Sequence, residues 1–274
     1  MQIYNGTGDY ILSHIAAPTS TVLRSVMSAR QYTVLTFAVL VLAPQVYTQN
    51  KELPDFLTVC KRHDPELNQC ITSTVDELRP ILRTGSEGFI PSLEPLNIRE
   101  IVVTEGSGLR IVGKDVKAHG SSEFVLSNLS ADMDKLDFEF DLDFPMMYIE
   151  AEYDINGRVL LIPIKGNGPL TGNFTDIKAH VRLVGELVDK DGSNFIKFTN
   201  LDIRMNVGHG KVKLENLFGG EKMLGDAVNA AINANFNQFL NELRHPIEKA
   251  LGESLLEISN DCVKDFTLDQ LSPL

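Results

Sequence analysis

LDFEFDLDF (residues 136–144) alternates apolar and acidic side chains without interruption. Leucine and phenylalanine occupy the even positions, and Asp137, Glu139, Asp141 and Asp143 occupy the odd ones. Successive side chains of a β-strand point to opposite faces of its sheet, so the pattern predicts a strand with one apolar and one acidic face. A row of carboxylates binds calcium only when further oxygen ligands converge on it, which a straight strand does not provide. We therefore interpret the acids as the solvent-facing side of the strand.

The alternation continues after this stretch with its parity reversed. Ile149, Tyr153 and Ile155 are apolar at odd positions, and the acids between them stand at even positions. A bulge or a bend at residues 145–147 would absorb this change, and Pro145 suits such a position. The acidic face is therefore expected to continue beyond the bend.

Strand patterns occupy most of the chain from residue 96 to about residue 217. Turn residues interrupt them at 105–108, at Asn156-Gly157 and at Asp191-Gly192. Asn-Gly and Asp-Gly pairs favour tight β-hairpins. Consecutive strands joined by hairpins predict an antiparallel sheet.

Residues 64–85 carry the signals of a first helix. Asp64 can cap its start and Pro65 suits the first helical position. Pro80 is expected to kink the last turn, and Gly85 to end the helix.

Residues 221–250 have apolar side chains at helical spacing along one stripe, which predicts one long helix with a kink or break near Pro246. A long amphipathic helix and a sheet with one apolar face can bury each other. We predict an α+β fold in which the long C-terminal helix is wrapped by a strongly curved antiparallel sheet. The space between them would be an apolar tunnel, or it would be filled by side chains as ordinary cores are.

The composition limits the classes of partner. The chain has 274 residues, a formal net charge of −12 and 43% hydrophobic residues. Nucleic-acid-binding proteins carry basic surfaces, and anionic membranes attract basic segments, so both are disfavoured as partners.

The N-terminal region predicts secretion. Residues 27–48 have a basic flank at Arg30, an apolar run over 34–43 and small or neutral residues before a cleavage point after Thr48. The run is too short to span a bilayer and has the length of a secretory signal peptide. Residues 1–26 are expected to be an upstream extension, and 49–274 the mature single domain, secreted and extracellular.

The cysteines and the sequons fit an extracellular chain. Cys60 and Cys70 are close in sequence and are expected to form a disulfide, whereas Cys262 is expected to remain a buried free thiol. A zinc site with His63 is the weaker alternative, because a fourth ligand is missing. Glycosylation is expected at the sequons of Asn128 and Asn173.

Catalytic motifs are weak throughout the chain. GSG at residues 106–108 lacks the pattern that flanks a nucleophile elbow, and GHGK at 208–211 lacks the rest of a phosphate-binding loop. His119 stands near Ser121 and Ser122 in sequence, but this adjacency does not make a triad. His180 lies on the polar parity of its strand. We predict neither catalysis nor a metal or other cofactor.

Three stretches resemble a known family: DFLTVCKRHDPELNQCI (55–71), GFIPSLEPLNI (88–98) and NLFGGEKMLGDAVNAAINANFNQFLNEL (216–243). They are similar to the insect takeout and juvenile-hormone-binding proteins, often described as circadian-clock-controlled, and the resemblance covers residues 53–274. Hormone-binding members carry a second disulfide, for which this chain has no cysteine pair. The chain therefore looks more like the takeout branch, which argues against juvenile hormone itself as the ligand.

The resemblance implies the tubular lipid-binding fold, with an internal hydrophobic tunnel and a role in transporting a terpenoid or fatty-acid-like lipid. We expect a monomer without stable membrane insertion. The alternative function is that of a ligand-free signalling protein that acts through a receptor, and a hydrolase is less favoured. The residues expected to line the tunnel are Phe138, Phe140, Leu142, Phe144, Ile149, Tyr153, Val181, Leu183, Ile203, Met205, Val228, Ile232, Phe236 and Phe239.

Overall fold

The strands form an antiparallel sheet, as predicted. A computed structural model describes residues 51–106 and 108–274, so the predicted extension 1–26 and signal peptide 27–48 lie outside the described residues. The strands are β1 (Leu96–Gly106), β2 (Leu109–His119), β3 (Val125–Asp132), β4 (Asp137–Val159), β5 (Ile162–Lys190) and β6 (Ser193–Leu214). Their order is β1-β2-β4-β5-β6, and β3 pairs with β4 as a side branch.

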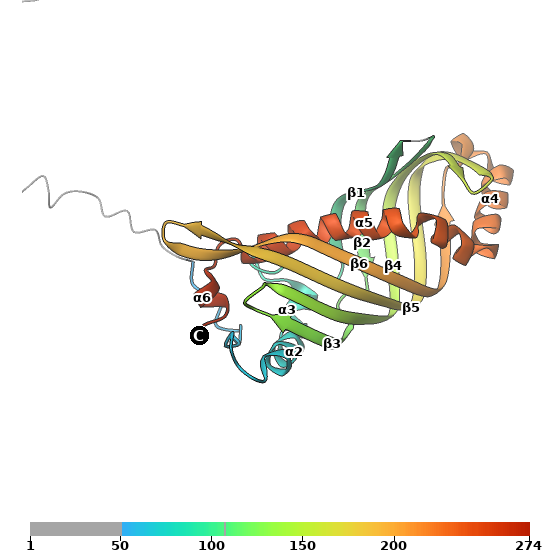
Figure 1. Ribbon diagram of the computed structural model, residues 1–274. Helices are drawn as coiled ribbons and strands as arrows, with labels where there is room; N and C mark the ends of the chain where they lie inside the picture. The colour runs from blue at the N-terminus through green and yellow to red at the C-terminus, as the bar shows by residue number, and fades with distance from the viewer. Residues whose placement is uncertain (1–50, 107) are drawn as a thin grey trace, which may run out of the picture. The chain divides into compact units, whose positions relative to one another are not determined.

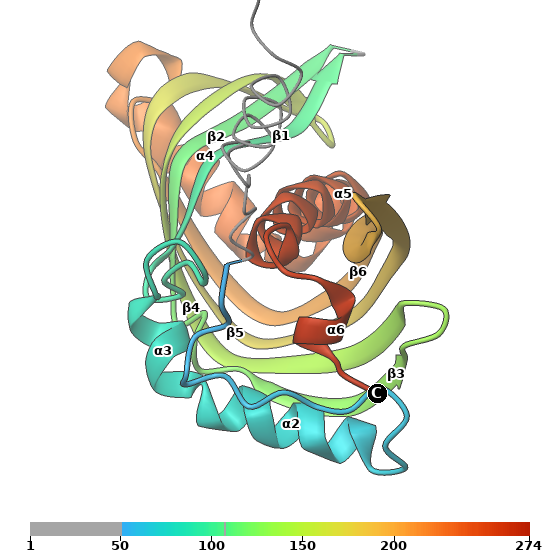
Figure 2. The same cartoon turned by 90° about the vertical axis from the view of Figure 1, so that its left-hand side faces the viewer.

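The sheet curls around helix α5 (Phe236–Val263), as the end-on view shows (Figures 1 and 2). α5 packs against β6 and also against β1, which stand at opposite ends of the strand order. One helix can contact both ends only if the sheet is strongly curved. The concave face of β4 and β5 is therefore enclosed between the two ends and α5.

The long C-terminal helix is interrupted at a different place from the one predicted. Helix α4 (Lys222–Ala234) ends at Asn235, whose φ of −122° is not helical, and α5 begins at the next residue. Pro246 lies inside α5, which continues to Val263 rather than ending near residue 250. Apolar side chains of α5 pack against the sheet on both sides of Pro246, and this packing explains why the helix persists after losing one backbone hydrogen bond.

The first predicted helix is divided into α2 (Leu67–Glu77) and α3 (Arg79–Thr84). Asp64 precedes the helix, where its Oδ1 accepts a hydrogen bond from the Glu66 backbone N–H at 2.8 Å. Pro80 lies in the first turn of α3 instead of kinking a last turn, because a proline needs no hydrogen bond there. Gly85 ends α3 as predicted, with a φ of 78°. The shorter helices η1 (Phe218–Gly220) and α6 (Leu268–Leu271) complete the fold.

The predicted disulfide joins Cys60 to Cys70, and Cys262 is a free thiol, also as predicted. The bridge attaches the N-terminal segment to α2. The same segment is tied to the C-terminus, because the Ser272 hydroxyl donates to the Cys60 carbonyl at 2.7 Å and the Arg62 backbone N–H donates to the Pro273 carbonyl at 2.9 Å.

The predicted parity change is a bend shared by three strands. The pairing of β4 with β5 keeps its register across Pro145 and Asp176, and that of β5 with β6 keeps it across Asp176 and Gly208. Asp176 has a φ of 55°, and a Cβ on Gly208 would lie only 2.7 Å from the Asp176 Cβ. One inserted residue in each strand reverses the facing of the side chains without shifting the register. In β6, accordingly, odd-numbered Val207 and even-numbered Leu214 are both buried.

One of the predicted hairpin turns is wrong. Asp191-Gly192 does connect β5 to β6, but Asn156-Gly157 lies inside β4, and the β4–β5 turn is at Leu160–Leu161. Gly157 has a φ of 145°, and a Cβ there would clash with the Gly108 carbonyl. The glycine therefore makes room for the neighbouring hairpin. Leu160 adopts a φ of 55° and packs against the core, so packing outweighs local turn preference.

Candidate ligand-binding interior

Four predicted lining residues meet at the centre of the concave face. Phe140 pairs with Val181 across β4 and β5, and Val181 pairs with Ile203 of β6. The central cluster, as we call it, consists of buried Ala179, Val181 and Ile203 with Phe140, Leu142, Leu201, Leu251 and Leu255 packed against them. Leu251 and Leu255 belong to the part of α5 beyond the predicted helix end.

The other predicted residues are distributed along the interior rather than gathered at one point. Phe138 and Leu183 pack against a cluster around buried Leu136 and Phe198, near the β5–β6 hairpin. Tyr153, Val228, Ile232 and Phe239 belong to a third cluster, which also includes Ile155, Val159, Ile164, Leu214 and Leu217. The apolar interior is therefore long and divided into three clusters.

Phe144, Ile149, Met205 and Phe236 lie outside these clusters and are partly buried. The Phe236 ring lies 6.0 Å from that of Phe174 across the α5–β5 interface. A Cβ at Gly210 would clash with the outer edge of the Phe236 ring, so the glycine makes room for the ring in its present position.

Burial separates the predicted lining residues into two kinds. Tyr153, Val181, Ile203, Ile232 and Phe239 are buried, whereas the remaining ones are partly buried despite their apolar character. Fully packed cores leave large apolar side chains little accessible surface. Partly accessible phenylalanine and leucine side chains on the concave face are what an interior that accepts an apolar molecule requires.

Tyr153 is the polar group in the third cluster. Its side chain is 5% exposed, and its hydroxyl donates a hydrogen bond to the Glu215 carbonyl. Burial raises the pKa of Tyr153 to about 12. The tyrosine thus remains neutral and keeps this region apolar.

The acidic row of β4 faces a basic row on β5 instead of water alone. Asp137 accepts two hydrogen bonds from Arg182, at 3.0 and 2.7 Å, and Lys178 pairs with Asp143 at 2.7 Å. His180 lies between Asp141 at 2.7 Å and Glu139 at 3.2 Å. These cross-strand pairs lie on the convex face, opposite the apolar residues.

Hydrogen bonds lower the pKa values of two of these carboxyls. The Arg182 guanidinium holds the pKa of Asp137 below its usual range, and Asn128, followed by His180, lowers the pKa of Asp141. The carboxylates are therefore ionised at neutral pH and are balanced by neighbouring donors, which is the geometry of a solvated charged surface.

Helical asparagines cap the free edge of β6. Asn229 and Asn233 each accept from and donate to the backbone, Asn229 at Leu214 (2.8 and 2.9 Å) and Asn233 at Val212 (both 2.8 Å). Each amide side chain thus replaces the missing neighbouring strand. We call residues 212–214 of β6 the capped stretch.

Two more caps lie farther along the same edge. The Met205 N–H donates to Glu248 Oε1 at 2.7 Å, and Asn260 exchanges two hydrogen bonds of 2.9 Å with the Phe198 backbone. The capping residues were not predicted from the sequence, although the asparagines at 229, 233, 237 and 241 repeat at the spacing of one helical face.

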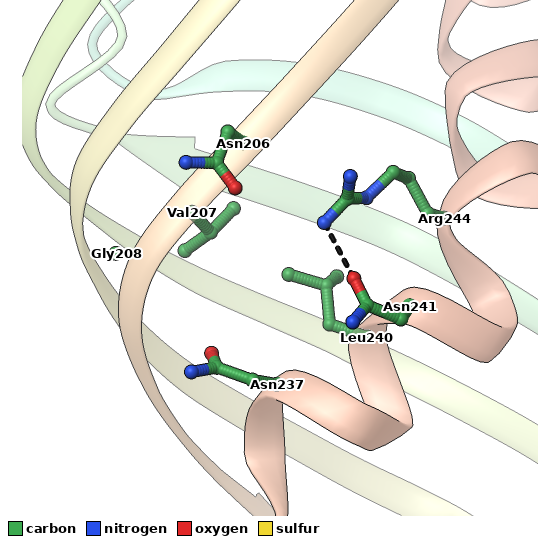
Figure 3. Close-up of a pocket in the computed structure, with 7 residues that line it drawn as sticks. All are labelled: Asn206, Val207, Gly208, Asn237, Leu240, Asn241 and Arg244. Carbon is green, nitrogen blue, oxygen red and sulfur yellow. Dashed lines mark hydrogen bonds between the residues drawn. The ribbon is translucent and has the colours of Figure 1, made fainter.

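Between the caps at Val212 and Met205, the free edge of β6 borders cavities instead of capping side chains. There, residues 206–210 of β6, which we call the open stretch, border two cavities of about 270 and 280 Å³. The first is lined by Asn206, Val207, Gly208, Asn237, Leu240, Asn241 and Arg244 (Figure 3). The second is lined by residues 208–210 and 233–238, at the junction of α4 and α5.

The serines next to His119 are not arranged as a nucleophile with its base. The Ser121 hydroxyl donates to the Ala118 carbonyl at 3.0 Å, and the Ser122 hydroxyl lies 3.3 Å from a Glu94 oxygen and 3.2 Å from a Glu123 oxygen, to one of which it donates. His119 instead lies 3.7 Å from Glu94 and 3.6 Å from Glu150. GHGK (208–211) lies within β6 and precedes no helix, unlike a phosphate-binding loop.

The remaining predicted sites are placed as follows. Both zinc-candidate sulfurs beside His63 are consumed by the disulfide, and the described part of the chain contains no group of three or more side chains suited to hold a metal. Asn128 and Asn173 are exposed on the sheet, and the Asn128 amide donates to Asp141 at 2.7 Å. Glycosylation at these positions stays a prediction.

The comparison with known proteins agrees with this geometry. Residues 34–273 match the family model described as haemolymph juvenile hormone binding protein (JHBP). The chain belongs to this family. The predicted membership of the takeout and JHBP group is thus confirmed. Among the described residues of this JHBP-family chain, no helix has the length and apolar character needed to cross a membrane.

Three individual relatives have about one fifth to one quarter of their aligned residues identical to this chain. The circadian clock-controlled protein daywake of Drosophila yakuba is 23% identical over 229 residues, covering 79% of this chain and 87% of that protein, and daywake of Drosophila melanogaster matches equally. A putative beta-carotene-binding protein of Schistocerca gregaria is 22% identical over 231 residues, covering 83% and 88%.

A solved structure confirms the fold. The crystal structure of Epiphyas postvittana Takeout 1 matches with a TM-score of 0.65 at 22% identity, covering 79% of this chain and 99% of that one. The curved antiparallel sheet with C-terminal helices is therefore the tubular lipid-binding fold, as predicted.

Proposed function

We propose that the protein is a secreted carrier that binds a small hydrophobic molecule, terpenoid or fatty-acid-like, between the concave face of the sheet and α5. The observation that carries this proposal is the partial burial of large apolar side chains along the interior, including Phe138, Phe140 and Leu142. Family membership supports it, as does the similarity to the putative beta-carotene-binding protein of Schistocerca gregaria.

The energetics allow reversible carriage. Burial of about 400 Å² of ligand apolar surface is worth at most ~10 kcal/mol. Loss of ligand and side-chain freedom removes several of these kcal/mol, so we expect dissociation constants from micromolar to high nanomolar. Such a ligand can be both taken up and released.

The disulfide and the charged convex face support an extracellular location. Disulfides persist in oxidising compartments, and the Cys60–Cys70 bridge joins the N-terminal segment to α2. Acidic and basic side chains alternate across β4 and β5 on the convex face, which favours solubility.

Lipid analysis of the secreted protein tests the proposal. Native mass spectrometry and organic extraction should show a co-purified apolar compound, and the neutral fluorophore N-phenyl-1-naphthylamine should bind to the delipidated protein. A folded protein that carries no lipid and fails to bind the fluorophore would contradict carriage. That result would favour the alternative, a ligand-free signalling protein.

A further inference from the structure

The open stretch of β6 coincides with a charged group that lacks an ionic partner. Arg244 extends from α5 toward β6, with Asn206 and Val207 on the opposite side of the 270 Å³ cavity (Figure 3). Its guanidinium donates one hydrogen bond, to Asn241 Oδ1 at 2.5 Å. Its Nε is buried and has no hydrogen-bond partner, and no ion pair to Arg244 is found within residues 51–106 and 108–274.

No neighbouring carboxylate forms an ion pair with this cation among the described residues. The carboxylate of Glu248, one helical turn away, instead accepts the Met205 N–H through Oε1 at 2.7 Å. Every other polar side chain lining the cavity is an asparagine amide, namely Asn206, Asn237 and Asn241. A partly buried guanidinium without a direct ion pair is incompletely compensated, and arginine binds carboxylates through paired, charge-assisted hydrogen bonds.

The cavity also has an apolar side. Val207 is buried and points to the interior, and Leu240 lines the same space from α5. The adjoining cavity reaches Phe236. A molecule with one anionic end and one apolar chain would therefore meet Arg244 with its head and the interior with its chain.

We propose that Arg244, together with Asn241, binds the carboxylate of an amphiphilic ligand at a lateral opening between β6 and the α4–α5 junction. This inference rests on the proposed carrier function and specifies its ligand class as an acid rather than an ester, alcohol or hydrocarbon. The open stretch lacks the asparagine caps of residues 212–214 because this part of the edge serves the ligand's head.

Displacement of N-phenyl-1-naphthylamine by palmitic acid and by methyl palmitate tests the proposal on the full secreted chain. The two compounds share one alkyl chain and differ in the carboxylate. We expect the acid to bind the wild-type protein about tenfold more tightly than the ester, since a hydrogen-bonded charge pair is worth about that factor. Equal binding of acid and ester would overturn the assignment while leaving the carrier function intact. Failure of both compounds and of the fluorophore would instead contradict the carrier function.

Substitutions then locate the effect. Arg244→Gln should abolish the preference for the acid over the ester, whereas Lys249→Gln, which removes an exposed cation of the same helix, should preserve it. Asn241→Asp gives a second test that retains the packing of Arg244, because the new carboxylate would pair with the guanidinium and likewise remove the preference. An unchanged acid-to-ester ratio in folded Arg244→Gln or Asn241→Asp protein would overturn the proposal.

Discussion

Helical asparagines lie along both the capped and the open stretch of β6, but their roles differ between the two. Asn233 and Asn229 each satisfy a backbone N–H and a carbonyl of the capped stretch. Asn237 and Asn241 continue the same four-residue spacing, yet they line a cavity, and Asn241 accepts from Arg244 instead of binding the strand.

The difference arises from the chain geometry between the two pairs. Asn235 separates α4 from α5, β6 changes its facing at Gly208, and both residues line the second cavity. The match between the four-residue spacing of the helical asparagines and the residues of β6 is therefore interrupted at the same place in the helix and in the strand. A backbone edge left without caps must be satisfied by water or by a ligand, so the open stretch is suited to exchange with the outside.

The largest effect should come from the apolar interior that both stretches enclose. Phe140→Asp would place a carboxylate in the central cluster, at a cost of roughly 3–5 kcal/mol of unfolding free energy, and should abolish secretion or ligand uptake. Denaturant unfolding and secreted yield measure this.

The control lies one residue away, on the other face. Glu139→Lys alters an exposed side chain of the convex face and should cost well under ~1 kcal/mol. If calcium raised the melting temperature, and Glu139→Lys removed that rise while Phe140→Asp had little effect, the acidic row would be a metal site after all.

Substitution of the asparagines tests the comparison directly. Asn233→Ala leaves the Val212 N–H and carbonyl without their partners and should lower the unfolding free energy by about 2 kcal/mol. Asn237→Ala should lower it by less than about 0.5 kcal/mol, because the exposed Asn237 side chain caps no strand. Equal losses in urea unfolding would show that the open stretch is capped in solution.

Ionisation of Tyr153 reports whether water reaches the apolar interior behind the capped stretch. Tyr153→Phe removes the hydrogen bond to the Glu215 carbonyl and should cost about 1 kcal/mol at pH 8. Since the pKa of Tyr153 is raised to about 12 in the fold, its contribution is complete below the ordinary tyrosine pKa of about 10 and is lost as the pH rises toward 12.

Ultraviolet titration of tyrosinate in wild-type and Tyr153→Phe protein separates this group from the other tyrosines of the chain. Ionisation of Tyr153 near pH 10 in the folded protein would mean that water reaches the third cluster.

The periodicity of apolar and polar residues was enough to predict the sheet, the long helix around which it curves, and the bend near Pro145. These features follow from local patterns in the sequence. Asn156-Gly157 misled because Gly157 accommodates a carbonyl of another hairpin, a contact between distant segments. The break at Asn235 was missed for a similar reason: the apolar stripe continues across it, and only packing on β6 distinguishes the two helices. Arg244 carried no local signal, since what sets it apart is the lack of a partner in three dimensions.

The smallest effect is expected where two hydrogen bonds lie on the exposed convex face. Arg182 donates two hydrogen bonds to Asp137, the same number that Asn233 makes, but its side chain is 53% exposed. Water replaces such bonds at little cost, so Arg182→Gln should change the melting temperature by an amount close to experimental error at neutral pH.

Arg182 holds the pKa of Asp137 below its ordinary value, so any stabilisation is present above that ordinary pKa and is lost as the pH falls through the lowered one. Wild-type and Arg182→Gln melting curves should therefore converge fully in acid. If Arg182→Gln lowered stability at neutral pH as much as Asn233→Ala does, burial would not determine how much these hydrogen bonds contribute. Burial is the property that distinguishes the capped edge from the convex face.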